Sequence, residues 1–273
     1  MYERYWQLKE KPFENTPNPH FAYYSPKHEE ALMRMLYAIN EHKGFAVLTG
    51  DYGSGKTLLS RLLLQELSKD EKRCNVALIV NPLLSAIEFL REIIYQLDGS
   101  DHKEDKLTLL HMLNDYLYQG LKNKKETVVI VDEAQLIPES LFDELRLLLN
   151  FQLDDRYLLS LIFIGQPELI NIIKKVKQLE QRIAVRYHLT GLEEAEVKSY
   201  IAHRLQVAGC EKQIFEDDVC KTIYNRTAGI PRKINMICDM SLMIGMIKKS
   251  AIINNEIVLE VIADYNDQFR NDI

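Results

Sequence analysis

Cysteine is scarce in this sequence, and the four that occur stand far apart. They lie at positions 74, 210, 220 and 238 and form no C-x-x-C pair, so neither a zinc knuckle nor a thioredoxin-type redox motif is present. Glycine and proline are also few, at 11 and 8 of 273 residues, which excludes collagen-like and low-complexity chains. We expect a folded globular protein with isolated, buried thiols, as in a reducing compartment.

Long apolar runs and an excess of positive charge are missing as well. The longest apolar runs, such as residues 158–165, have the length of a buried strand and fall short of the roughly 20 residues of a membrane helix. The N-terminus lacks the basic and apolar regions of a signal peptide. With 34 Lys and Arg against 40 Asp and Glu, the net charge is −6. This charge does not favour binding to nucleic acid or to an anionic membrane. We expect a soluble, cytoplasmic protein.

The first 28 residues combine aromatic side chains with four prolines. Proline at this density prevents long regular elements, so residues 1–28 are predicted to form a strap on the protein surface. Its aromatic rings either pack against the protein or contribute a wall of an adenine site. Apolar residues at helical spacing follow over residues 26–42.

Short apolar runs then alternate with helix-patterned segments over residues 29–191. The runs at 44–49, 76–80, 128–131, 158–164 and 185–189 predict an α/β fold with a five-stranded parallel sheet and helices on both faces. Residues 98–108 are predicted to be a polar surface loop. Residues 192–273 show only helical spacing, which predicts a small all-helical domain. Its first helix would end near residue 209, and three more would span residues 219–227, 234–246 and 256–264. Asn254 or Asn255 would cap the last helix.

Residues 50–57 fit the phosphate-loop pattern G-x-x-x-x-G-K-[ST]. Glycines at 50, 53 and 55 allow a tight turn whose N–H groups face phosphate oxygens at a helix N-terminus. Lys56 would reach the β- and γ-phosphates, and the Thr57 hydroxyl would hold Mg²⁺. ATP and Mg²⁺ are therefore the predicted cofactors. The predicted nucleotide-binding residues are Gly50, Asp51, Tyr52, Gly53, Ser54, Gly55, Lys56, Thr57 and Leu58.

Two carboxylates follow the predicted strand at 128–131. Ligands in open α/β sheets bind at the carboxyl ends of the strands, which is where Asp132 and Glu133 stand. Asp132 would bind Mg²⁺, directly or through water. Glu133 would act on the water that attacks the γ-phosphate, as a general base or by orienting it.

Together these features resemble an AAA+ ATPase, and further motifs resemble the ExeA/GspA group of that class. That group includes ATPases tied to type II secretion and to MSHA-type pilus assembly, and it is distantly similar to the TnsC and TniB transposition ATPases. The resemblance covers nearly the whole chain. The motifs are Tyr5-Trp6-x-Leu8, Pro12-Phe13, Asn18-Pro-x-Phe21, Tyr24, Gly44-Phe-x-Val-Leu-Thr-Gly50, Asp132-Glu-Ala-Gln135, Gly165-Gln-Pro-Glu-Leu169, Gln181-Arg-Ile183 and Gly229-Ile-Pro-Arg232.

The resemblance implies further catalytic residues. Gln166 occupies the sensor 1 position, where a polar side chain contacts the γ-phosphate or the attacking water. Arg182 and Arg186 precede or begin the last predicted strand, where related ATPases present an arginine finger to a neighbouring subunit, and the spacing does not choose between them. Arg232 matches sensor 2, so the helical domain would act as a lid.

The same resemblance implies self-association into a ring or filament and a role in assembling a secretion or type IV pilus-like machine. The protein would lie in the cytoplasm or peripherally at the inner face of the membrane through a partner. An ATP-dependent, DNA-binding regulator of transposition is the alternative, and a nucleotide-gated scaffold that hardly hydrolyses ATP is a third. The basic run at Lys122, Lys124 and Lys125 fits a solvated loop as well as DNA contact. The chain is either a short member of the group or a piece of a longer one.

Overall fold

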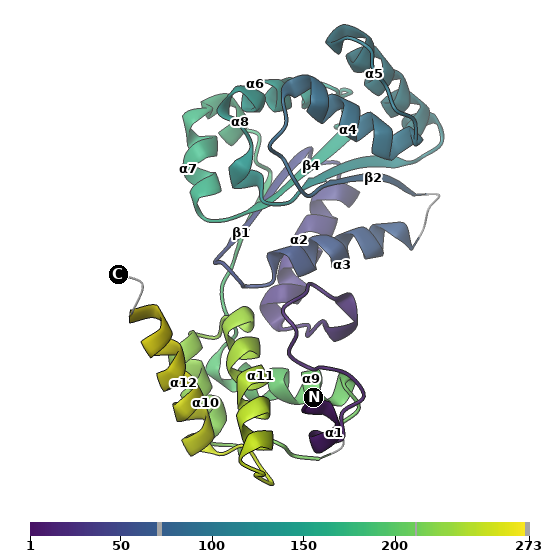
Figure 1. Ribbon diagram of the computed structural model, residues 1–273. Helices are drawn as coiled ribbons and strands as arrows, with labels where there is room; N and C mark the ends of the chain where they lie inside the picture. Colours follow the sequence, from purple (N-terminus) through teal and green to yellow (C-terminus); the bar gives the residue numbers. More distant parts are fainter. Residues whose placement is uncertain (70–72, 211, 271–273) are drawn as a thin grey trace. The chain divides into compact units, whose positions relative to one another are not determined.

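The computed structural model describes residues 1–69, 73–210 and 212–270, and the chain divides into two compact units (Figure 1). The sheet unit comprises His28–Tyr52 and Lys56–Leu189. The helical unit comprises Met1–Lys27, Gly53–Gly55 and Thr190–Ile273. Residues 271–273 of the helical domain predicted over 192–273 lie outside the described residues.

The sheet unit is built on five parallel strands in the order β2-β3-β4-β1-β5. Two of the three interior strands, β1 and β4, are buried at every position, which explains why they are continuous apolar runs. All five predicted strands are present, so the predicted fold class is confirmed. The strands are β1 (Phe45–Gly50), β2 (Cys74–Ile79), β3 (Glu126–Val131), β4 (Leu159–Gly165) and β5 (Val185–Leu189).

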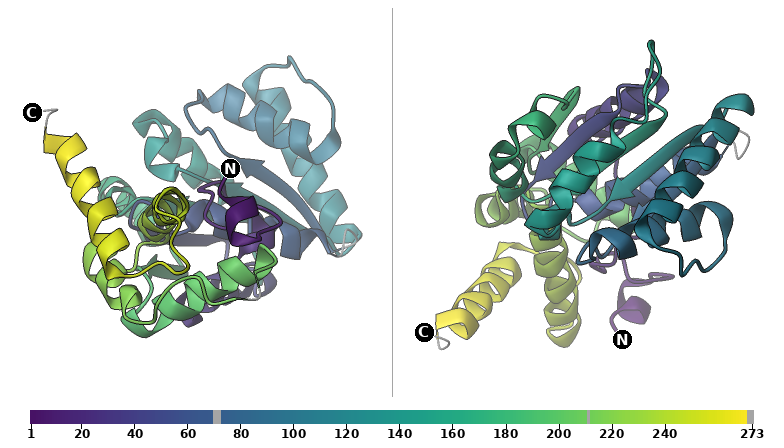
Figure 2. Two further views of the ribbon diagram at one scale, coloured as in Figure 1. Left: turned by 60° about the horizontal axis from the view of Figure 1, so that its bottom comes forward. Right: turned by 90° about the horizontal axis from the view of Figure 1, so that it is seen from above.

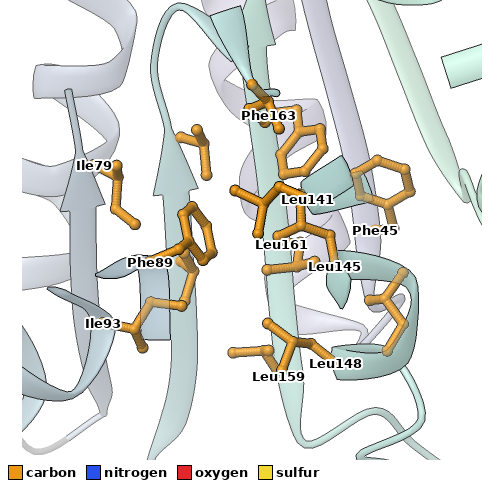
Figure 3. Close-up of a cluster of buried hydrophobic side chains, with 14 of the residues drawn as sticks. Phe45, Ile79, Phe89, Ile93, Leu141, Leu145, Leu148, Leu159, Leu161 and Phe163 are labelled. Carbon is orange, nitrogen blue, oxygen red and sulfur yellow. The ribbon is translucent and has the colours of Figure 1, made fainter. Parts of the chain in front are cut away.

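Helices cover both faces of this sheet (Figure 2). On one face lie α2 (Pro26–Asn40) and α3 (Lys56–Ser68). On the other, alternate strand residues such as Phe45, Leu161 and Phe163 pack against α4, α6 and their neighbours in a fully buried apolar core (Figure 3). The helices of this second face are α4 (Ala86–Asp98), α5 (Lys106–Lys122), α6 (Glu139–Leu148), α7 (Glu168–Lys175) and α8 (Lys177–Glu180).

The predicted polar loop at 98–108 is shorter than expected. Residues 106–108 form the first turn of α5, because the Asp105 side chain accepts hydrogen bonds from the N–H groups of Leu107 and Thr108. A capping box at Ser85 and Glu88 begins α4 in a similar way. The loop prediction was therefore wrong at its C-terminal end, where an aspartate cap turns a polar stretch into helix.

Four longer helices lie in the described part of the helical unit. They are α9 (Glu194–Val207), α10 (Val219–Thr227), α11 (Pro231–Ile247) and α12 (Asn255–Arg270). Asn254 is the cap of α12, since its Oδ1 accepts a hydrogen bond from the Ile257 N–H at 3.2 Å. None of the described helices is both long and apolar enough to cross a membrane.

The N-terminal residues belong to the helical unit, where they form α1 (Glu3–Trp6) and the short 3₁₀ helix η1 (Pro19–Phe21). Trp6 is buried and donates its indole N–H to the Leu242 carbonyl at 2.8 Å. Tyr2, Phe13 and Phe21 are buried in the same core. These rings therefore serve packing, whereas the Tyr24 side chain is 48% exposed.

All four cysteines are free thiols. Cys220 and Cys238 are buried, as expected, but Cys74 and Cys210 are half-buried. Burial raises the pKa of the Cys238 thiol well above its usual value and raises the pKa of Cys220 as well. The two buried thiols are therefore neutral at physiological pH.

Candidate nucleotide site

The phosphate loop joins β1 to α3. Gly53 and Gly55 have φ values of +83° and +103°, which residues with a Cβ rarely adopt. At Gly53 a Cβ would also lie 2.7 Å from the Arg232 Cβ. Glycine at positions 53 and 55 is thus required by the conformation of the loop.

Lys56 is the first residue of α3, and its side chain is directed back to the loop. Its Nζ donates hydrogen bonds to the Gly50 carbonyl at 2.8 Å and the Asp51 carbonyl at 2.9 Å. The residue is only 6% exposed. Burial lowers the pKa of Lys56, while the nearby carboxylates of Glu133 and Asp132 oppose the shift. A desolvated ammonium group beside a glycine loop is suited to bind phosphate oxygens.

Asp132 follows β3 and is 3% exposed. Its carboxylate accepts hydrogen bonds from the Ser60 hydroxyl at 3.3 Å, from the Thr57 hydroxyl and from the Glu133 N–H at 2.9 Å. Burial raises the pKa of Asp132, and within the described part of the chain it forms no salt bridge with Lys or Arg. A buried carboxylate beside the Thr57 hydroxyl is an oxygen donor set that fits Mg²⁺.

Glu133 has a left-handed backbone, with φ 51° and ψ 36°. A non-glycine residue in this region costs about 1 kcal/mol or more, and such strain gathers at functional sites. Its carboxylate Oε2 accepts a hydrogen bond from the Gln135 side-chain amide at 2.6 Å. The Glu133 side chain is therefore held in a defined position.

Gln166 follows β4, the strand next to β3 in the sheet. Its backbone N–H donates to the Gln135 Oε1 at 2.9 Å. At the carboxyl ends of β3 and β4, the Gln135 side chain thus connects Glu133 to Gln166. Gln135 belongs to the Asp132-Glu-Ala-Gln135 motif, but sequence reasoning assigned it no role, because its partner at 166 is adjacent only in the folded sheet.

The two candidate finger arginines differ in their surroundings. Arg182 lies between α8 and β5 and donates to the Arg146 carbonyl at 3.4 Å and to the Asn150 Oδ1 at 2.7 Å, at the C-terminal end of α6. Arg186 lies on β5, at the edge of the sheet, and its side chain is exposed. Among the residues that the structure describes, neither arginine forms a hydrogen bond with the phosphate loop of its own chain.

Arg232 is the second residue of α11, directly after Pro231. Its backbone N–H donates to the Gly53 carbonyl at 3.2 Å, and the loop residues Gly53–Gly55 group with the helical unit. The backbone N–H and the side-chain carbons of the predicted sensor residue thus both lie close to Gly53.

Comparison with known proteins agrees with this fold. A family model described as an AAA domain matches residues 39–173. Among solved structures, Aeropyrum pernix ORC2 has a TM-score of 0.67 at 16% identity, covering 93% of this chain and 71% of that chain. The Thermotoga maritima RuvB Holliday junction branch migration motor has a TM-score of 0.57 at 18% identity, covering 86% and 68%. The fold and the site define an ATPase of the AAA+ class.

One relative identifies the family within the AAA+ class. General secretion pathway protein A of Aeromonas hydrophila is 39% identical over 263 residues, which cover 95% of this chain and 48% of the relative. This chain therefore spans about half the length of that relative. It belongs to the ExeA/GspA family of AAA+ ATPases.

Proposed function

We propose that this chain binds ATP with Mg²⁺ and hydrolyses the bond between the β- and γ-phosphates. The observation that carries the proposal is the convergence of Lys56, Thr57, Asp132 and Glu133 at the carboxyl ends of β1 and β3. A cation for phosphate, two oxygen ligands for Mg²⁺ and a carboxylate for water are the parts that phosphoryl transfer to water needs.

Lys56 would exchange its bonds to the Gly50 and Asp51 carbonyls for β- and γ-phosphate oxygens. Thr57 and Asp132 would hold Mg²⁺, which supplies charge neutralisation of the phosphates. Because Asp132 accepts only neutral donors in the hydrogen bonds described, a bound cation would stabilise its buried charge.

Glu133 would orient the attacking water and accept its proton. Gln166 would contact the γ-phosphate or the same water. An arginine of a second copy, Arg182 or Arg186, would stabilise charge on the transferring phosphoryl group, so turnover would require self-association. Arg232 would act as a sensor in the helical unit.

We further propose that the ATPase cycle serves assembly of a secretion or type IV pilus-like machine. The support is the 39% identity to general secretion pathway protein A over nearly the whole of this chain. The net charge of −6 weighs against the alternative of a DNA-binding transposition regulator, because phosphate contacts need clustered cations.

The test compares Glu133→Gln and Lys56→Ala with the wild type in nucleotide binding and phosphate release, over a range of protein concentrations. Glu133→Gln should retain ATP binding and lose turnover, whereas Lys56→Ala should lose binding. Turnover that rises with protein concentration and ignores duplex DNA would support a self-assembling secretion or pilus ATPase. Strong stimulation by DNA would support the transposition regulator, and binding without turnover would support a switch.

A further inference from the structure

The side chain of Gln135 connects two groups of the nucleotide site. Its Nε2 donates to the Glu133 Oε2 at 2.6 Å, and its Oε1 accepts from the Gln166 N–H at 2.9 Å. An amide is planar and rigid, so its nitrogen and oxygen cannot move independently. A shift at one of these partners is therefore transmitted to the other.

The local fold is arranged to make this connection. The 3₁₀ helix η2 (Ala134–Leu136) turns the chain back after Glu133, with Leu136 N–H donating to the Glu133 carbonyl at 2.8 Å. Parallel pairing of Val131 with Phe163 places the ends of β3 and β4 side by side.

The residue before Gln166 must be small for the link to form. A Cβ on Gly165 would lie 2.7 Å from the Gln135 Oε1 and 3.3 Å from the Gln135 backbone nitrogen. Gly165 has no positive φ, so glycine is explained here by the approach of Gln135 rather than by backbone conformation.

We propose that Gln135 is a positioning residue that couples the Glu133 carboxylate to the backbone at Gln166. This inference rests on the proposed function: when the segment at Gln166 meets the γ-phosphate, Gln135 moves the Glu133 carboxylate with it. Gln135 itself would contact neither the phosphate nor the attacking water. Its effect on hydrolysis is exerted through Glu133.

The activity test uses Gln135→Met, which removes both hydrogen bonds at similar length, and Gln135→Glu, which keeps the acceptor for Gln166 but sets a carboxylate against Glu133. We expect kcat to fall about 10-fold or more in both variants, because catalytic groups must be held in place to act, while KM changes less than about twofold. If the wild type turns over ATP and both Gln135 variants keep its kcat, the coupling is overturned while the proposed function stands.

Gln96→Met is the matched control. Gln96 also bridges a backbone and a glutamate, since its amide bonds the Leu78 N–H and carbonyl and the Glu92 carboxylate, but it lies on α4, away from the phosphate loop. We expect Gln96→Met to lower thermal stability at an unchanged kcat. A loss of kcat equal to that of Gln135→Met would show that the effect is merely structural.

A second measurement does not depend on turnover. Amide hydrogen exchange at Gln166 is compared in the wild type, Glu133→Ala, Gln135→Met and the double variant. Coupling predicts that Glu133→Ala speeds exchange at Gln166 in the wild-type background and has no further effect when Gln135 is already Met. An equal effect of Glu133→Ala in both backgrounds, or none in either, would overturn the inference even if the chain proved inactive as an ATPase.

Discussion

The Arg204 guanidinium lies 4.7 Å from the centroid of the Phe21 ring, so a helix of the C-terminal half stacks on the N-terminal segment. Arg204 is 5% exposed, and it donates to the Pro12 carbonyl at 2.5 Å and to the Glu14 carbonyl at 3.0 Å. A buried arginine of this kind is stable because its donors are satisfied. The N-terminal segment is thereby part of the helical unit, to which Arg204 and its own aromatic rings hold it.

Arg204→Ala should destabilise the helical unit by about 2–4 kcal/mol, because it leaves the buried Pro12 carbonyl unpaired, breaks the bond to the Glu14 carbonyl and removes the stacking cation. Trp6 is the single tryptophan and is buried in this unit, so its fluorescence reports unfolding in urea. The control is Arg34→Ala, which removes an exposed ion pair with Glu30 and a stacking contact on Tyr187 in the sheet unit. A tryptophan transition that Arg204→Ala leaves in place would contradict the role assigned to this side chain.

Asp132→Asn should stabilise the protein in the absence of nucleotide and Mg²⁺ while removing the effect of Mg²⁺ on ATP binding. The reason is that a buried charge without a cation costs free energy, which functional sites accept for the sake of activity. We expect a gain of about 1 kcal/mol in thermal or urea unfolding. Nucleotide titrations with and without Mg²⁺ provide the second measurement, and an Mg²⁺ response equal to that of the wild type would exclude Asp132 as a ligand.

Arg182→Ala and Arg186→Ala should have different effects. Arg182 bonds to the C-terminal end of α6, so its loss should lower stability as well as turnover, by about 1–2 kcal/mol for the lost hydrogen bonds. Arg186 is exposed, so Arg186→Ala should leave the melting temperature unchanged. If Arg186 is the residue that acts on a neighbouring subunit, its variant loses the rise of turnover with protein concentration; mixing it with Lys56→Ala then tests whether either copy can complement the other.

Tyr200→Phe should change how stability depends on alkaline pH. Burial raises the pKa of Tyr200 from 10.0 to about 12, so folding favours the neutral phenol. The contribution of the neutral Tyr200 phenol to the free energy of unfolding is fully present below pH 10. It is lost as the pH rises from 10 to 12, at up to about 1.4 kcal/mol per pH unit. The phenol also donates to the Asn235 Oδ1 at 2.7 Å. Tyr200→Phe should therefore be less stable at pH 8, and the difference should shrink above pH 10 in urea unfolding followed by Trp6 fluorescence. A constant difference across this range would contradict the raised pKa.

Several parts of this protein follow from local patterns. The phosphate loop is contiguous from Gly50 to Thr57, and its position between a strand and a helix is encoded by neighbouring apolar residues. Asp132 and Glu133 likewise stand directly after a strand that their own segment defines. Strands and helices were predictable for the same reason, since periodicity depends on residues within one element.

Partnerships between distant residues could not be derived in this way. Gln135 meets Gln166 because β3 and β4 are neighbours in the order β2-β3-β4-β1-β5, and periodicity carries no information on strand order. Arg204 meets Pro12, and Arg182 meets Asn150, through contacts whose sequence separation is large. Local propensity specifies the elements and the contiguous motif, whereas burial and hydrogen-bond satisfaction across the folded chain select the partner of each long side chain.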